Sequence, residues 1–571
     1  MGKRTGDKKA DDNRKSFTTL VREQVTEIYL VIMLGIFPLF LVKGYEDLVY
    51  RKWDLFRYSS FIFVLISLVT GVVCLLASGG MLLRKANAGK ANAGKANAGK
   101  TNAGKAKAGK AYTGKANTGK IGWKAAENDG KWFRGMSCTD WFVLAYLFCT
   151  VISYIGAVDK QTALWGVDTW YTGFLTQLLL VGIYFGVSRG YTKIKYLKVL
   201  TAAAGVAVSA IVILQRFGVD VLHLYRGFGE EVRLNFVTTL GQVTWTSGYI
   251  SILLVAGMGV YYLMEEKKKK IFWGICIGTG FAAELLLNCD SGILAVTGAF
   301  MILVWLAIGS RERTLRLIEL MMTALAAAGI VGILERIFSS RMVSIDTIYF
   351  KAAQSMLVYI LLAALAVLYL LVKKDKLHLG RKYRDAAKAA YLFLLCMGIL
   401  TLAALFYLHG KGYFAGSPTE NYFRFTVWWG NSRGFIWRVG AAVFGDFGIG
   451  RKLFGCGPDC FMPYAYGLMG DAINEFWHNQ IVPNVHNEWF NAVINYGIIG
   501  GAAYLGIFVS SAWSLMKSGI DKAGSAVVFG TGLAAAAYIV HNILCYQQII
   551  GTPLIFILIG LGAAIVRRGG K

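Results

Sequence analysis

The sequence predicts an all-α polytopic membrane protein with about 14 transmembrane helices. Its 571 residues are 56% hydrophobic, with a mean hydropathy of +0.51. Apolar runs repeatedly reach the roughly 20 residues that an α-helix needs to cross a bilayer. The basic residues gather in alternate loops between these runs, which is typical of a multi-pass protein.

The apolar runs divide the chain into two N-terminal helices (25–83), a central bundle (138–408) and C-terminal helices with a basic tail (488–571). The first run comes after the basic segment 1–24, and no small-residue cleavage site follows it. We therefore expect an uncleaved helix rather than a signal peptide. We place the spans near residues 25–42, 60–83, 139–157, 172–187, 196–214, 246–263, 271–288, 291–308, 316–334, 353–372, 388–408, 488–511, 523–541 and 552–566.

The charge distribution predicts the orientation of the chain. With a cytoplasmic N-terminus, the segments on the inner side hold 43 of the 60 Lys and Arg residues. The positive-inside rule then places both termini in the cytoplasm, in a protein of the cytoplasmic membrane. It also places the long segment 409–487 on the outer face.

The net charge of +27 comes in large part from the cytoplasmic segment 84–137. Residues 86–120 of this segment are seven tandem pentads, from "ANAGK" to "ANTGK". One cation every five residues among Gly and Ala can neither bury a core nor stack on bases. We expect a disordered basic loop that lies on anionic lipid, and no nucleic-acid partner.

The outer segment 409–487 is too long for an idle connector, and we expect it to bind substrate. In "SRGFIWRVGAAVFGDFGIG", Ile436, Val439 and Val443 share one helical face, which predicts an amphipathic helix at the membrane interface. Arginine suits phosphate or diphosphate because its planar fork donates two charge-assisted hydrogen bonds. The candidates in this segment are Arg433, Arg438 and Arg424. The alternative is that they contact lipid headgroups or neighbouring acids.

Two further stretches carry candidate chemistry. "KLFGCGPDCF" forms a Gly-x-Gly-Pro turn whose backbone amides, at Gly455 and Gly457, come together in a tight bend. "HNEWF" then opens a membrane span with His486, Asn487 and Glu488. Imidazole titrates near neutral pH and is suited to proton transfer. Asn487 either orients that imidazole or caps the helix, and Glu488 is the competing base.

Two residues outside this segment are candidates for the same cavity. Asp290 lies in a short outer turn between two spans, where a carboxylate must be solvated or paired, and His541 ends the penultimate span. We expect no metal and no cofactor. The chain has no CxxC pair, no Cys and His cluster with zinc spacing, and no Asp-x-Asp pair on the outer side.

The order of these stretches resembles the O-antigen ligase and polymerase superfamily. The resemblance rests on "SRGFIW", then "LFGCGPDCF", then "HNEWFNAVINYGIIG", and more weakly on "ILQRFGVD", "FVTTLGQVTWTSGYISILL" and "NCDSGILAV". It covers roughly residues 140–566. The chain departs from the family in having "TLGQ" for Thr-Leu-Gly-Asn, Ser291-Gly292 for Ser-Arg, and aromatics in "LWGVDTWYTGF" where an arginine is common.

The resemblance implies a GT-C-like, metal-independent, inverting glycosyltransferase of cell-surface polysaccharide biosynthesis. Its donor would be a glycan on undecaprenyl diphosphate, and its acceptor a hydroxyl of another glycan or lipid-glycan. Arg433, with Arg438 or Arg424 and the glycine amides, would then hold the diphosphate, and His486 would assist the acceptor hydroxyl.

The alternatives are a flippase or transporter of lipid-linked sugars and a non-catalytic scaffold. Transporters commonly show inverted repeats, which the sequence does not display. A scaffold would leave "GCGPD" and "HNEWF" unexplained. Ligases and polymerases share these stretches, so the sequence does not distinguish them.

Overall fold

The computed structural model describes residues 17–98, 135–192, 194–343, 348–375, 384–417, 419–521 and 525–569. This part of the chain is almost entirely helical. Ten of its helices are long and apolar enough to cross a membrane, and three shorter apolar helices accompany them. The predicted class of all-α polytopic membrane protein is therefore confirmed, while the exact number of spans and their orientation remain predictions.

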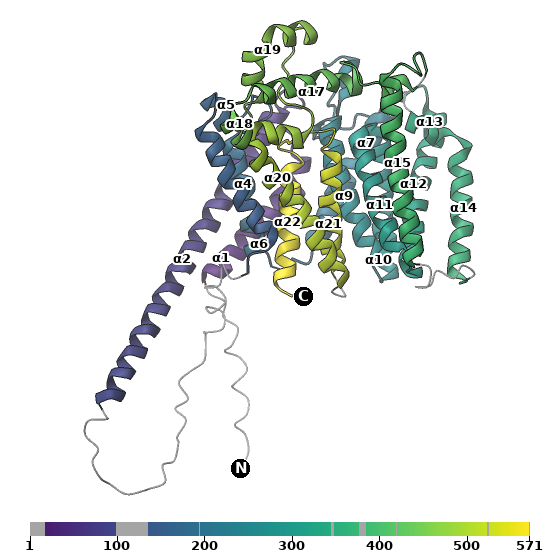
Figure 1. The fold of residues 1–571 in the computed structure, drawn as a ribbon. Coiled ribbons are helices and arrows are strands. Elements are labelled where there is room, and N and C mark those ends of the chain that lie inside the picture. Colours follow the sequence, from purple (N-terminus) through teal and green to yellow (C-terminus); the bar gives the residue numbers. More distant parts are fainter. Residues whose placement is uncertain are drawn as a thin grey trace, which may run out of the picture.

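The N-terminal part contains α1 (Phe17–Val31), a π-helical turn (Ile32–Ile36), a 3-10 turn (Phe37–Leu39) and α2 (Leu48–Ala98). The helix ends near Pro38, which lacks the N–H that a continuing helix needs. α2 runs beyond residue 83 into the first pentads (Figure 1), in keeping with the high helix propensity of Ala and Lys. The rest of the predicted loop, up to residue 134, lies outside the described residues.

The central bundle and the segment after it contain the remaining elements. They are α4 (Cys138–Ile155), α5 (Lys160–Trp165), α6 (Phe174–Gly190), α7 (Leu197–Arg216), α8 (Glu230–Asn235), β1 (Phe236–Val237), β2 (Gly241–Gln242), α9 (Val243–Tyr262), α10 (Lys267–Leu287), α11 (Asp290–Ala307), α12 (Arg311–Phe338), α13 (Ile348–Gln354), α14 (Met356–Lys373), α15 (Arg384–Gly410), α16 (Glu420–Phe423), α17 (Trp429–Asp446), α18 (Ile449–Phe454), α19 (Phe461–Trp477), α20 (Glu488–Asp521), α21 (Ala526–His541) and α22 (Thr552–Arg567). The two strands pair antiparallel as a small hairpin before α9.

The core of the bundle forms around α9, α20, α21 and α22. The apolar window of α9 is 78% buried, whereas that of α15 is not buried at all. α9 packs against α21, α21 against α20, and α22 against α6. α14 and α15 therefore lie at the edge, where their apolar side chains face the surroundings of the bundle (Figure 1).

The two ends of the bundle differ. At one end, here called the loop face, lie α5, α17, α18 and α19 (Figure 1). α17 buries Ile436, Val439 and Val443, which is the predicted amphipathic face. The opposite end, here called the terminal face, is where α1 begins and α22 ends (Figure 1).

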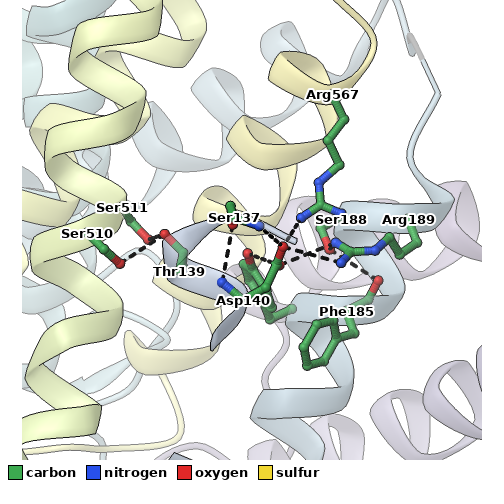
Figure 2. Close-up of polar contacts among 10 residues, drawn as sticks. Ser137, Thr139, Asp140, Phe185, Ser188, Arg189, Ser510, Ser511 and Arg567 are labelled. Atoms are coloured by element: carbon green, nitrogen blue, oxygen red, sulfur yellow. Dashed lines mark hydrogen bonds and ion pairs between the residues drawn. The ribbon is translucent and has the colours of Figure 1, made fainter. Parts of the chain in front are cut away.

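A buried carboxylate joins three helices at the terminal face. Asp140, in the first turn of α4, accepts hydrogen bonds from Tyr184 Oη of α6 at 2.7 Å and from Arg567 of α22. Arg189 Nη2 of α6 lies 3.4 Å from the same carboxylate (Figure 2). Ser137 completes a capping box with Asp140 at the start of α4.

A glycine contact fixes the end of α18 against α20. Gly497 interrupts the helical backbone of α20 with φ +74°, and Gly455 has φ +82°. A Cβ on Gly497 would lie 2.1 Å from the carbonyl carbon of Leu453, and one on Gly455 would lie 2.2 Å from Asn495 O. Only glycine allows two backbones to approach so closely with these dihedral angles.

We expect Gly497→Ala to lower the free energy of unfolding by about 1–3 kcal/mol from backbone strain alone, with further loss from the overlap with Leu453. The measurement is thermal unfolding in detergent, followed by tryptophan fluorescence. Gly450→Ala is the matched control, because a Cβ there meets nothing within 4 Å. Equal unfolding temperatures for the two variants would contradict the assignment.

Candidate functional site

His486 lies directly before α20, in a backbone conformation with φ +52°. Its N–H donates to Asn484 Oδ1 at 3.0 Å, and its Nδ1 lies 3.2 Å from the carbonyl oxygen of Asn484. Since a carbonyl only accepts, Nδ1 carries the proton of the neutral ring. Nε2 is then left with the lone pair, which is the form that accepts a proton.

Arg433 stands at the start of α17, after a strained turn. Gly430, Asn431 and Ser432 all have positive φ, between 58° and 67°. A Cβ on Gly434 would lie 1.9 Å from Thr426 O, so the chain is tightly folded on both sides of Arg433. Strain of this kind persists only where the surrounding structure imposes it, and it is frequent at functional sites.

The guanidinium of Arg433 retains unused donor capacity. Nη1 donates to Gly430 O at 2.7 Å. Nε is buried and has no hydrogen-bond partner within the described part of the chain. A buried N–H without a partner is costly, so this atom is ready to bind an anion or other acceptor.

In the structure Arg433 lies near enough to His486 for its charge to act on the imidazole. Burial lowers the pKa of His486 to about 4, and the positive charge of Arg433 adds to the effect. The imidazole is therefore neutral at physiological pH beside a permanent cation. This pairing combines a proton acceptor with an anion-binding group.

Aromatic side chains also lie next to His486 and around its neighbour Tyr546. Tyr546, from the segment between α21 and α22, packs edge-on against His486 with 4.9 Å between the ring centroids. Trp245 Nε1 donates to Tyr546 Oη at 3.1 Å, and Tyr546 Oη donates to Gln242 Oε1 at 2.8 Å. Trp170 lies edge-on to Tyr546 at 4.7 Å.

Two residues of this group come from stretches where the family resemblance is weak or where the chain departs from it. Gln242 ends "TLGQ", and Trp170 belongs to "LWGVDTWYTGF". Both contact Tyr546, which packs against His486 and which the sequence analysis did not name. Aromatic faces with a few fixed polar groups are typical of small-molecule sites.

The two neighbours of His486 have structural roles. Asn487 Oδ1 accepts the N–H of Phe490 at 3.0 Å, which decides in favour of a helix cap. Glu488 is 2% exposed and accepts hydrogen bonds from Tyr504 Oη at 2.6 Å and Tyr538 Oη at 2.8 Å. Both phenols lie in the bundle core, so the structure does not support Glu488 as a competing base.

The other predicted diphosphate ligands are either exposed or already hydrogen-bonded within the protein. Arg424 is exposed and pairs with Glu420. Arg438 is exposed on α17, about 140° around the helix from Arg433.

The amides of the glycine turn have partners within the protein. Gly455 donates its N–H to Arg451 O at 2.7 Å, and Gly457 donates its N–H to Asn495 O at 3.2 Å. Both amides are therefore already used: Gly455 closes the last turn of α18, and Gly457 holds the turn against α20. The prediction that they bind a diphosphate does not agree with the structure.

Asp459, in the turn after Gly457, has a positioning role. Its Oδ2 accepts the N–H of Val167 at 2.8 Å. Burial raises the pKa of Asp459 to about 6. This contact attaches the turn to the segment that carries Trp170.

Asp290 and His541 have hydrogen-bond partners other than Arg433 and His486. Asp290 is exposed and accepts a hydrogen bond from Tyr349 Oη at 2.5 Å. His541 is 2% exposed, with Nε2 3.0 Å from Ser291 Oγ and Nδ1 2.9 Å from Asn542 Oδ1.

A buried acid that the sequence analysis missed lies in α10. Glu284 Oε2 accepts a hydrogen bond from Ser247 Oγ at 2.9 Å, and its Oε1 is buried without a partner in the described residues. A carboxyl group inside an apolar helix was the available signal. In the residues that the structure describes, no three His, Cys, Asp or Glu side chains are grouped as metal ligands.

A scan against known protein families finds no family that matches this chain, and a search of curated protein sequences finds no match. The likeness to the ligase and polymerase superfamily therefore rests on the stretches quoted above. The geometry around Arg433 and His486 is independent of that likeness.

Replacing Glu488 separates its structural role from a chemical one. We expect Glu488→Ala to reduce stability by about 1–3 kcal/mol for each phenol left without an acceptor. Glu488→Gln should be milder, because its amide oxygen still accepts a hydrogen bond. The measurement is the thermal unfolding of both variants in detergent. A fully stable Glu488→Ala protein would show that the contacts to Tyr504 and Tyr538 do not hold the bundle together.

The pKa of His486 can be tested without any assay of activity. Diethyl pyrocarbonate modifies neutral imidazole, so its reaction with His486 should persist to about pH 4 before protonation stops it. Arg433→Gln removes the neighbouring cation, which raises the pKa of His486, and the reaction should then stop at a higher pH. Peptide mass spectrometry gives the rate at His486, with the exposed His223 as a check on the reagent. An unchanged pH profile in Arg433→Gln would mean that the two side chains are not coupled.

Proposed function

We propose that this protein is an integral-membrane glycosyltransferase that moves a glycan from an undecaprenyl-diphosphate-linked donor to an acceptor hydroxyl. The reaction would take place at the outer face of the cytoplasmic membrane, in cell-surface polysaccharide biosynthesis. The observation that carries the proposal is the proximity of a neutral His486 to Arg433, whose buried Nε has no hydrogen-bond partner among the described residues. These two residues are 53 positions apart in the chain and come from two of the three C-terminal stretches on which the family resemblance mainly rests.

Arg433 acts on the leaving group. As the bond between the anomeric carbon and the diphosphate oxygen breaks, that oxygen keeps the electron pair and negative charge develops on it. A guanidinium with free N–H groups stabilises this charge by charge-assisted hydrogen bonds. The intact donor, before the bond breaks, makes the same contacts less strongly because its bridging oxygen carries less charge. The interaction therefore favours the transition state.

His486 acts on the acceptor. The acceptor oxygen forms the new bond to the anomeric carbon from the side opposite the diphosphate, which inverts that carbon. Nε2 of His486, with its lone pair, takes the hydroxyl proton. The carbonyl oxygen of Asn484 holds the Nδ1 proton, so the ring keeps the required tautomer. Tyr546 and Trp170 offer aromatic faces beside this position for the sugar rings.

The proposed diphosphate site includes fewer residues than the sequence analysis predicted. Arg433 remains its central residue, while Arg424 is neutralised by Glu420. The glycine turn supports the proposal indirectly, because it holds the loop-face helices against α20. The GT-C-like architecture and the use of a polyprenyl carrier remain parts of this proposal.

A second candidate function is transport of lipid-linked sugars. Its support is the buried Glu284 and the buried pair of His541 and Ser291, all in apolar helices. Ionisable groups inside membrane helices often mark transport pathways or proton relays. The transferase is favoured because Arg433 and His486 gather at one end of the bundle.

We expect His486→Ala to slow glycan transfer by about 10²–10⁴-fold through loss of the proton acceptor. Arg433→Lys should slow it by about 10²–10³-fold, because a lysine cannot form the same bidentate contact. The measurement is mass spectrometry of polyprenyl-linked glycans from the native host, with the gene intact, deleted or mutated. Accumulation of single repeat units would indicate a polymerase, and accumulation of long chains a ligase.

Arg451→Lys is the matched control, since Arg451 lies in α18 and stacks on Tyr464. It should leave the glycan profile unchanged. Normal transfer by both His486→Ala and Arg433→Lys, in proteins that insert normally, would reject the proposed roles. Accumulation of polyprenyl-linked glycan on the inner face of the membrane, seen only in the Glu284→Gln variant, would favour the transport function.

A further inference from the structure

A groove on the flank of the bundle has no part in the proposed reaction. It lies between α1, α2, α4 and α6 and has a volume of about 480 Å³. Its walls are mainly apolar, and they include Phe61, Leu68, Leu144, Leu178 and Phe185. Phe61 and Leu68 are more than half exposed.

The groove is about as long as a lipid tail. Its lining on α6 extends from Leu175 to Arg189, which is about 21 Å at 1.5 Å per residue. One leaflet of the hydrocarbon core is about 15 Å thick, half of the bilayer value. An acyl chain of the leaflet at the terminal face therefore fits along the groove.

The end of the groove at the terminal face is cationic. Arg22 and Arg189 both line it, and Arg22 Cγ lies within 3.3 Å of the position that a Cβ on Gly190 would take. Arg22 Nε is buried and has no hydrogen-bond partner within the described residues.

The nearby acid does not neutralise this end. Asp140 is shared between Arg189 and Arg567, so one carboxylate faces two guanidinium groups (Figure 2). Arg568 is close enough to feel both the carboxylate of Glu23 and the charge of Arg22. The four arginines Arg22, Arg189, Arg567 and Arg568 thus outnumber the two acids Asp140 and Glu23. A phosphate at this position would be attracted by the surplus positive charge.

The geometry points to a binding site for an anionic phospholipid of the leaflet at the terminal face. One acyl chain lies in the groove, and the phosphate binds Arg22 and Arg189. The site is at the opposite end of the bundle from Arg433 and His486, so it does not depend on the proposed transferase function. The lipid would bridge α1 and α6 and hold the N-terminal helices against the bundle.

The test compares phosphatidylglycerol with phosphatidylcholine, added to the delipidated full-length protein in detergent. Native mass spectrometry gives the amount bound, and the unfolding temperature gives the stabilisation. We expect phosphatidylglycerol to bind more tightly and to raise the unfolding temperature more. Arg22→Gln should weaken phosphatidylglycerol binding by about tenfold or more, through the loss of charge-assisted hydrogen bonds.

Two further variants make the test specific. Leu144→Trp fills the groove without changing charge, and it should reduce the binding of phosphatidylglycerol. Lys269→Gln removes the same charge from an exposed position on α10, where Lys269 pairs with Glu266, and should have no effect. Equal binding of the two lipids, or unchanged phosphatidylglycerol binding in both Arg22→Gln and Leu144→Trp, would overturn the inference. Recovery of a polyprenyl phosphate as the tightly bound lipid would also overturn it.

Discussion

The arrangement of the loop face depends on one buried carboxylate, that of Glu488. In an apolar bundle each polar group must find its partners within the protein, because no water is available to satisfy it. Glu488 meets this requirement with the phenols of Tyr504 and Tyr538, while its own N–H donates to Asn542 O. The start of α20 is thereby attached to the end of α21, and His486, two residues earlier, is held at the mouth of the bundle.

The hydrogen bonds extend from Glu488 to other helices. Gln547 Nε2 donates to Tyr504 Oη and to Gln177 Oε1, which also accepts a hydrogen bond from Tyr146 Oη. These contacts join α20 to the segment before α22, to α6 and to α4. A network whose members are all satisfied gives a core one defined arrangement, and it makes each member costly to remove.

A second constraint is the close approach of backbones on the loop face. Gly434, Gly455 and Gly497 each occupy positions where a Cβ would overlap a neighbouring main chain. The glycine stretches of the sequence therefore build the support for the site rather than its ligand contacts. This explains why the amides of the Gly-x-Gly-Pro turn are used internally. A rigid support would serve the proposed reaction, because a preorganised group stabilises developing charge without having to move first.

The sequence by itself determined the membrane class, the approximate positions of the apolar helices and the amphipathic face of α17, and it named Arg433 and His486 as candidates. Hydropathy and helical periodicity are local properties of the chain, so they can be read without the fold. Only the tertiary structure decided which polar groups face one another. It placed Tyr546 and Asn484 beside His486, turned Glu488 to the core phenols, and left Arg424 and Arg438 exposed. The physical reason is that the partner of a buried polar group is set by helix packing between distant segments, and one-dimensional patterns do not contain that information.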